Sequence, residues 1–379
     1  MRPLQDDDVV LGQALISAVF DIEGKLLLER GHVVRSEGLR AALLERGFLQ
    51  EPETPEPAAE PASPETAPLT TSLAVQRSIF DGIRELLDAL AQVQLHLLRA
   101  EAGALADLLH LYALLRRYAE RDVDAALAAL QLSPNEDGFS ARPLHGALLV
   151  RVLGDAAGLS PSDIDSLACA ALTHDLALLP QAQTLHHQRE PVSPQQRMDI
   201  DHHTLQSAEL LRAAGVEDAL WLDAVLHHHE RLDGSGYPHR LAGAAISTGA
   251  RIVTLVDTYC AMIRPRAYRG PVQSKDALRA LFLERGTAVD EALTALFVKQ
   301  VGLYPPGGLV RLASNEIAVV VRRGSTGTQP EVRRLLKSDS MPDPERLRRD
   351  TADARYAVAE SLSQDSYRAL LRGIERLWD

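Results

Sequence analysis

The placement of histidine is the feature that most restricts how this chain can fold. Ten of its thirteen histidines fall between His145 and His239. Successive candidate metal ligands are separated by gaps of 29, 29, 25 and 28 residues: His145, His174-Asp175, His203, His228-His229 and Asp257. Each lies in or beside its own apolar helical segment, one helix and one loop from the next. Facing helices of a bundle can bring such residues together in its core, so the spacing favours a helical domain with polar ligands pointing inward.

The residue types in this set indicate a metal centre. A neutral imidazole and a carboxylate supply the nitrogen and oxygen ligands that suit iron, manganese or zinc. The Asp of the His174-Asp175 pair can bridge two ions. Asp257 follows the apolar Leu255-Val256, and a buried carboxylate there is costly unless it is paired or bound to a metal. Unclustered histidines such as His96 and His110 are more often surface or helix-packing residues, and we assign them no role.

Five histidines of the cluster are left over from the ligand set. We interpret them as surface residues or as neighbours that orient the ligands; they are His186, His187, His202, His227 and His239. The run His227-His228-His229 ends a helical segment and is followed at once by Asp-Gly-Ser-Gly-Tyr-Pro. Gly234 and Gly236 in this turn permit backbone conformations that a Cβ would forbid.

A proline-rich stretch divides the chain. Residues 51–70 carry six prolines and few apolar groups, a composition typical of an extended linker. Residues 1–50 are expected to form a small α+β unit. It would have strand character over Val9–Phe20, a turn at residues 21–24, a returning strand at Lys25–Leu28 and a helix from Ser36 to Arg46.

The remainder is predicted to be mainly α, with a helical bundle as its core. Residues 71–132 have helical periodicity and fit either a connector or a homodimerisation segment. Residues 133–301 form the bundle, in which Ser160-Pro161 and Ser193-Pro194 mark helix starts. Residues 302–379 are expected to be a β-hairpin, from Leu309–Leu312 and Ile317–Val321, followed by a helical extension.

Bulk properties exclude several classes of protein. A net charge of −12 argues against binding of a nucleic-acid polymer, which needs a basic face. We find no apolar run of about 18 residues, so no membrane span is predicted. The N-terminus is acidic where a signal peptide would be basic, and the two cysteines provide no disulfide framework. We therefore expect a cytoplasmic protein.

Residues 133 to 302 resemble the HD-GYP family, bacterial phosphodiesterases of the HD superfamily that hydrolyse cyclic di-GMP. The resemblance rests on His145, on the His174-Asp175 pair and on His203. It continues through the run from His228 to Pro238 and through Asp257 to Arg266-Ala267-Tyr268-Arg269. The stretch of two histidines, glutamate and the Asp-Gly-Ser-Gly-Tyr-Pro loop is its most specific part.

The resemblance implies an HD-type helical bundle as the core of the fold, together with a mechanism and a set of roles. Two divalent metal ions, iron or manganese, are implied with Asp175 bridging them; their ligands are His145, His174, Asp175, His203, His228, His229 and Asp257. A third ion is not expected, because Ala141 stands where some members have glutamate. Hydroxide formed at the metals would attack phosphorus, giving pGpG or GMP, with His174 and Asp175 catalytic. Arg266, Arg269 and Tyr237 would contact substrate, and the Gly-Tyr-Pro loop would dock signalling proteins.

Two departures from the family pattern keep alternatives open. Leu178 and Gly270 stand where members carry lysines that contact substrate phosphate. Each charge-assisted contact contributes roughly 1.5–3 kcal/mol, so their loss affects substrate affinity rather than metal binding. Besides a cyclic di-GMP phosphodiesterase, the pattern therefore fits a weak or inactive signalling scaffold that keeps its metals. It also fits a phosphohydrolase for another nucleotide.

Overall fold

The computed structural model divides into two compact units, Met1–Glu65 and Thr66–Asp379. The described residues are parts of 2–49, then 78–133, 141–264, 270, 272–324 and 326–378. The predicted linker over 51–70 lies outside them. None of the described helices is both long and apolar enough to cross a membrane.

The first unit is a small α+β fold. Its elements are β1 (Arg2–Pro3), β2 (Val19–Phe20), β3 (Leu26–Leu28), α1 (Glu37–Arg46) and β4 (Phe48–Leu49). The antiparallel sheet has the order β1-β4-β2-β3. The predicted hairpin is confirmed by the pairing of Val19 with Leu28, whereas the expected turn at residues 21–24 lies outside the described residues. Only the last two residues of the strand expected over Val9–Phe20 form a strand in the described part.

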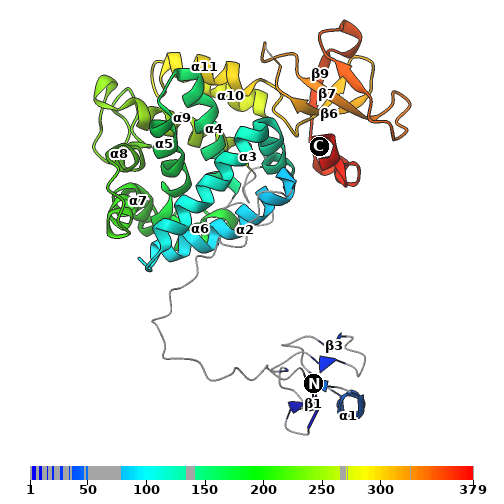
Figure 1. Ribbon diagram of the computed structural model, residues 1–379. Coiled ribbons are helices and arrows are strands. Elements are labelled where there is room, and N and C mark those ends of the chain that lie inside the picture. The colour runs from blue at the N-terminus through cyan, green and yellow to red at the C-terminus, as the bar shows by residue number, and fades with distance from the viewer. Residues whose placement is uncertain are drawn as a thin grey trace. The chain divides into compact units, whose positions relative to one another are not determined.

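The second unit is dominated by helices, as the sequence predicts (Figure 1). The α-helices are α2 (Ile79–Leu98), α3 (Ala104–Leu132), α4 (Ala141–Ala157), α5 (Pro161–Thr173), α6 (Leu179–His187), α7 (Pro194–Ala213), α8 (Ala219–His227), α9 (Thr248–Ile263), α10 (Ser274–Leu283) and α11 (Glu291–Val301). Short 3-10 helices η2 (Leu176–Leu178) and η3 (Gly243–Ala245) lie between them.

Side-chain caps determine where two site-bearing helices begin. The Ser160 hydroxyl accepts the backbone N–H of Asp163 at the start of α5. Ser193 and Gln196 form a reciprocal capping box at the start of α7. Each cap satisfies backbone donors that the first helical turn leaves unpaired, so both predicted starts are confirmed.

One large hydrophobic core joins α2 and α3 to the helices that follow them. It contains fully buried leucines from both groups, such as Leu86 and Leu111 on one side and Leu148 and Leu172 on the other. The Gln94 side-chain amide of α2 donates to the Leu172 carbonyl at 2.7 Å, two residues before His174. Helices α2 and α3 thus share the core of the bundle that carries the candidate ligands.

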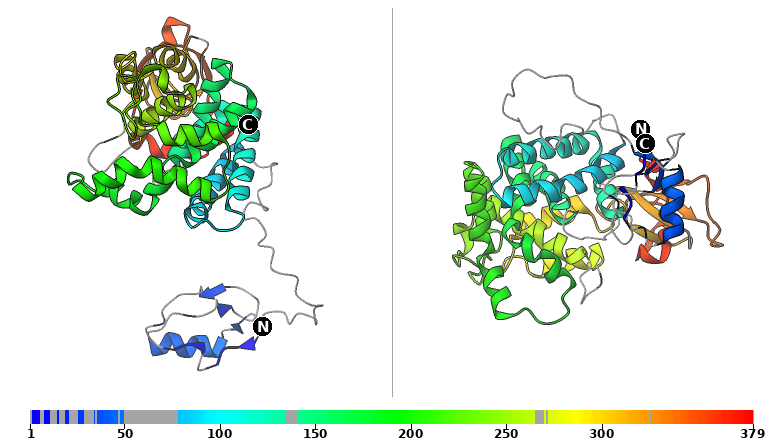
Figure 2. Two further views of the ribbon diagram at one scale, coloured as in Figure 1. Left: turned by 90° about the vertical axis from the view of Figure 1, so that its left-hand side faces the viewer. Right: turned by 90° about the horizontal axis from the view of Figure 1, so that it is seen from below.

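The C-terminal part is a five-stranded antiparallel sheet. Its strands are β5 (Leu309–Leu312), β6 (Ile317–Arg322), β7 (Glu331–Leu336), β8 (Arg348–Asp350) and β9 (Val358–Leu362), in the order β8-β7-β6-β5-β9. Figures 1 and 2 show this sheet at one end of the helical bundle. There Arg322 and Arg323 of the sheet region pair with Asp122 and Asp124 of α3.

The hairpin of β5 and β6 is confirmed, and the helical extension expected after it is confirmed only in part, because two further strands and short 3-10 helices stand there. Strands β8 and β9 are separated by the short 3-10 helix η4 (Ala354–Tyr356), and two more 3-10 helices, η5 (Asp365–Leu371) and η6 (Ile374–Leu377), follow β9. The reason is a long-range pairing: β9 lies beside β5, about fifty residues earlier, and completes the sheet edge. The periodicity of residues 358–362 gives no information about a strand partner so far away in the sequence.

Candidate metal centre

Hydrogen bonds to the main chain orient three histidine rings towards the centre of the bundle. The Nδ1 atoms of His174, His203 and His228 lie 3.0, 2.6 and 2.7 Å from the carbonyl oxygens of the residues three positions earlier. A carbonyl can only accept, so each ring carries a proton on Nδ1, and Nε2 is the nitrogen that faces inward. This is the usual way in which a histidine ligand is oriented for a metal.

Asp175 is shared between two groups of ligand atoms. One group contains Asp175, His203, His228 and His229, the other His174, Asp175 and Asp257, and within each group the ligand atoms lie within 4.8 Å of one another. The Oδ1 atom of Asp175 is 3.2 Å from His203 Nε2 and 3.9 Å from His228 Nε2, while Oδ2 is 3.6 Å from His174 Nε2. The two carboxylate oxygens therefore face different groups, as a bridging ligand requires.

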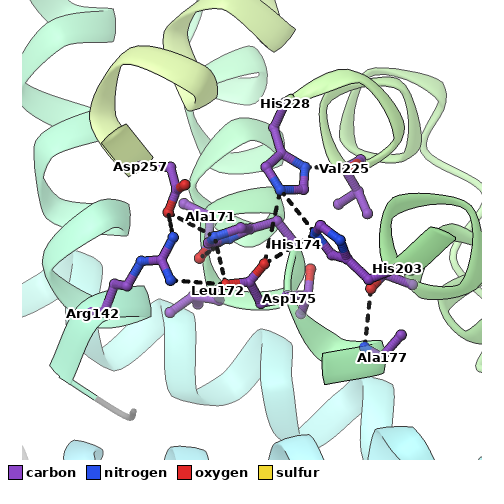
Figure 3. A network of polar contacts seen from close by, with 12 residues as sticks. Arg142, Ala171, Leu172, His174, Asp175, Ala177, His203, Val225, His228 and Asp257 are labelled. Carbon is purple, nitrogen blue, oxygen red and sulfur yellow. Dashed lines mark hydrogen bonds and ion pairs between the residues drawn. The ribbon is translucent and has the colours of Figure 1, made fainter. Parts of the chain in front are cut away.

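Arg142 enters this centre, and sequence reasoning missed it. Its guanidinium lies 3.1 Å from Asp175 Oδ2 and 2.5 Å from Asp257 Oδ1 (Figure 3). It comes from the first turn of α4, three residues before His145. The sequence does show an arginine one helical turn before the candidate ligand His145. Where its side chain points, however, depends on how α4 packs against α9.

His145 is placed differently from the other predicted ligands. It is buried in α4, and it belongs to neither group of ligand atoms. Its ring faces the ring of Tyr259 edge-on at a centroid distance of 6.5 Å, and its Nδ1 has no hydrogen-bond partner. An open nitrogen on a buried ring suits a metal ligand, so ligation by His145 stays a prediction.

Of the other predicted contacts, Tyr237 lies at a cleft above the ligands. Tyr237 stacks on His229 at a centroid distance of 4.8 Å and lines this cleft. Arg266 and Arg269 lie outside the described residues. Leu178, at a position where the family has lysine, also lines the cleft, whereas Gly270 is exposed.

The cleft offers about 1430 Å³ of empty space, including its open mouth. Its floor carries His174, Asp175 and Arg142, and part of its wall is Gln94 of α2. Apolar side chains make up much of the remaining wall; they include Leu178, Leu179, Ala182, Leu185, Val192 and Ile200. A mostly apolar cleft with a few convergent polar groups is the usual form of a small-molecule site.

Burial keeps two of the ligand rings neutral. The pKa of His228 lies well below its ordinary range, mainly because the ring is buried and secondly because of the neighbouring His229 ring. Burial lowers the pKa of His229 to about 4. Both rings are therefore uncharged near pH 7, and no proton has to leave before they bind a metal.

The carboxylates beside them are ionised. Burial alone would raise the pKa of Asp175, but His174 and Arg142 outweigh it and hold the pKa well below its usual range. The same balance lowers the pKa of Asp257, with Arg142 as the strongest opposing charge. Neutral imidazoles with anionic carboxylates are a donor set that fits divalent iron, manganese or zinc.

The free energy of unfolding of the metal-free chain is expected to decrease as the pH falls from about 6.5 towards 4. Burial lowers the pKa of His145 to about 3 and that of His229 to about 4, and that of His228 falls as well. These rings bind fewer protons in the folded chain than in the unfolded one, so stability increases with pH through this window. The pKa of His174 shifts in the opposite direction, because Asp175 and Asp257 raise it against burial, so this ring acts against the trend of the other three.

Thermal unfolding in chelator at about pH 7 and about pH 4.5 measures this dependence, since the unfolded histidines titrate near 6.5. A higher unfolding temperature at the lower pH would contradict the expectation.

The loop after His229 folds back onto the helix end that carries the ligands. The Tyr237 N–H donates to the His229 carbonyl at 3.2 Å. The buried Glu230 carboxylate accepts the backbone N–H groups of His239 and Leu241 at 2.6 and 2.9 Å. A Cβ on Gly236 would lie 2.4 to 2.5 Å from backbone atoms of residues 229–231, so only glycine fits this approach.

Replacement of Gly236 by alanine is expected to destabilise the protein by about 1–3 kcal/mol, the usual cost of forcing an extra carbon into a packed position. The matched control is Gly270→Ala, where a Cβ would meet nothing within 4 Å. Chemical denaturation of both variants measures the difference. Equal midpoints for the two variants would show that the loop can relax away from His229.

A comparison with known protein families matches the region that carries this site. Residues 113–293 match the family model described as HD domain. Cyclic di-GMP phosphodiesterase PA4108 from Pseudomonas aeruginosa is 28% identical over 229 residues, 60% of this chain and 55% of that protein. The 3'3'-cGAMP-specific phosphodiesterase 1 from Vibrio cholerae is 29% identical over 137 residues, 36% of this chain and 31% of that protein. The chain thus spans from about a third to about half of these curated relatives.

A solved structure shows the same fold. Bd1817, an HDG"Y"P protein from Bdellovibrio bacteriovorus, matches with a TM-score of 0.50 at 15% identity, covering 78% of this chain and 97% of its own. Residues 113–293 of this chain are therefore an HD domain, and proteins named as cyclic di-GMP phosphodiesterases are among its relatives.

Proposed function

We propose that this chain is a metal-dependent phosphodiesterase that hydrolyses cyclic di-GMP to pGpG or GMP. The observation that carries the proposal is Asp175, which presents one oxygen to each of two ligand groups at the floor of an open cleft. Relatives named as cyclic di-GMP and 3'3'-cGAMP phosphodiesterases support the same class of substrate.

The residues present fit two divalent ions, iron or manganese. The predicted ligands are His145, His174, Asp175, His203, His228, His229 and Asp257. When bound, such ions supply positive charge for the phosphoryl oxygens and hydroxide near neutral pH. Asp175 would lie between the two positions, and the buried walls would limit the access of bulk water.

The chain's own groups can hold the substrate in the cleft. The Arg142 guanidinium is 23% exposed and faces the cleft from its floor. It is a cation that lines the same cleft as Leu178, where this chain lacks the lysine of the family pattern. Tyr237 offers a ring at the wall, and Arg266 and Arg269 remain predicted phosphate contacts.

The alternative, a non-catalytic signalling scaffold, is motivated by Leu178 and Gly270 alone. The donors of both ligand groups are in place, which fits the enzyme and the scaffold alike; the relatives named as phosphodiesterases support the enzyme. Docking of signalling proteins on the Gly-Tyr-Pro loop and formation of a homodimer stay predictions.

The test is turnover by the purified full chain with manganese or ferrous iron. Cyclic di-GMP, 3'3'-cGAMP and linear pGpG are supplied separately, and the products are separated by chromatography. We expect cleavage of cyclic di-GMP that chelator abolishes. Metal content without cleavage would favour the scaffold, and cleavage of 3'3'-cGAMP alone would reassign the substrate.

A further inference from the structure

A second pair of histidines lies just outside the metal centre, and the proposed function does not use it. His227 Nε2 is 3.2 Å from His239 Nδ1. The other nitrogen of His227 lies 2.8 Å from Asp223 Oδ1, and Asp223 Oδ2 accepts the Ser247 hydroxyl at 2.5 Å. The His227 side chain is 14% exposed, and His239 is exposed.

The hydrogen bond from His227 to Asp223 determines which nitrogen is open. Asp223 is a carboxylate that accepts from Nδ1–H, so the Nε2 lone pair of His227 points towards His239. Carboxylate, imidazole and metal in that order is the arrangement in which histidine ligands are commonly held. Asp223 is itself fixed by Ser247, so the ring of His227 has a defined direction before any ligand binds.

The distance between the two rings matches a shared metal ion. Two nitrogens bonded at about 2.0–2.1 Å to one tetrahedral ion lie roughly 3.3 Å apart. The observed 3.2 Å therefore accommodates the ion with little movement of either ring. Two imidazoles favour zinc, nickel or copper over the oxygen-preferring magnesium and calcium.

We propose that His227 Nε2 and His239 Nδ1 bind one divalent transition-metal ion, with zinc as the representative, at a site separate from the catalytic centre. Asp223 is the positioning residue, and water or an external ligand completes the coordination. The site does not depend on the proposed hydrolytic activity.

Such an ion would connect two segments that border the catalytic centre. His227 is the last residue of α8 and directly precedes His228. His239 follows Tyr237-Pro238, and its N–H is held by Glu230. A bound ion would fasten the end of the Gly-Tyr-Pro loop to the helix that presents His228 and His229.

The test is equilibrium dialysis of the manganese-loaded full chain against zinc in the presence of excess manganese, with both metals counted by mass spectrometry. We expect the wild type to hold one zinc ion more than His239→Ala. Asp223→Asn should weaken the extra site by roughly 10- to 100-fold, the usual effect of removing the partner of a histidine ligand.

His202→Ala is the matched control. His202 is also exposed and also adjacent to a predicted ligand, but its Nδ1 lies 2.7 Å from the Met198 carbonyl. It should keep the zinc count of the wild type, and all variants should keep the same chelator-sensitive manganese.

A second readout is the unfolding temperature, which zinc should raise more in the wild type and in His202→Ala than in His239→Ala. Equal zinc counts in the wild type and His239→Ala would overturn the proposal and leave the two rings as a hydrogen-bonded pair. His239→Gln repeats the comparison should the alanine variant not fold.

Discussion

Replacing Asp175 by asparagine is expected to lower the hydrolysis of cyclic di-GMP by roughly 10³-fold or more, about 4 kcal/mol of transition-state stabilisation. Asp175 is the one residue common to both groups of ligand atoms. Asparagine keeps the shape of the side chain but removes the charge offered to each metal position. Metal content measured beside turnover should fall as well, because the same carboxylate serves both positions.

The control for this variant is Asp201→Asn, which removes the same charge from the exposed side of α7, where Asp201 pairs with Arg197. It should keep both metal and turnover. Thermal unfolding in chelator shows whether either variant is folded. Unchanged turnover by a folded Asp175→Asn protein would contradict a mechanism that depends on this site.

Replacing Leu178 by lysine is expected to tighten the binding of cyclic di-GMP by roughly 10- to 150-fold, which corresponds to about 1.5–3 kcal/mol for a hydrogen bond with a charged group. Leu178 lines the cleft beside His174 and Asp175, so an ammonium group there can reach a bound phosphate. The measurement is KM together with the dissociation constant of substrate in calcium, which is expected to support binding without turnover.

The control is Leu178→Gln, which introduces a polar side chain without charge. It should leave affinity within a few-fold of the wild type. Equal improvement by glutamine and lysine would mean that polarity rather than charge was missing, and no improvement by lysine would place the phosphates elsewhere in the cleft.

Those parts of the fold that depend on local signals could be predicted from the sequence. Ser160 and Ser193 cap helices where expected, because a cap depends on only three or four neighbouring residues. The turn between β5 and β6 contains Asn315 with φ of 63°, a conformation that asparagine tolerates well. The gathering of Asp175, His203 and His228 followed from the helical spacing of the chain.

The parts that could not be predicted depend on packing between distant segments. The contact of Arg142 with Asp257 joins residues 115 positions apart, and β9 reaches β5 only in the folded sheet. The tight approach of Gly236 to the chain around Glu230 likewise exists only once the loop has folded back. Each depends on geometry between elements, which composition and periodicity do not contain.

The oxygens that orient His174, His203 and His228 belong to the main chain at residues 171, 200 and 225. A side chain can be exchanged at those three positions without deleting the acceptor, provided that the helix end keeps its path. Most single substitutions around the three rings therefore leave the orientation of the rings unchanged. Relatives that differ widely in sequence can keep the same centre, while the cleft above it, built from side chains such as Leu178, is free to diverge in the ligand it accepts.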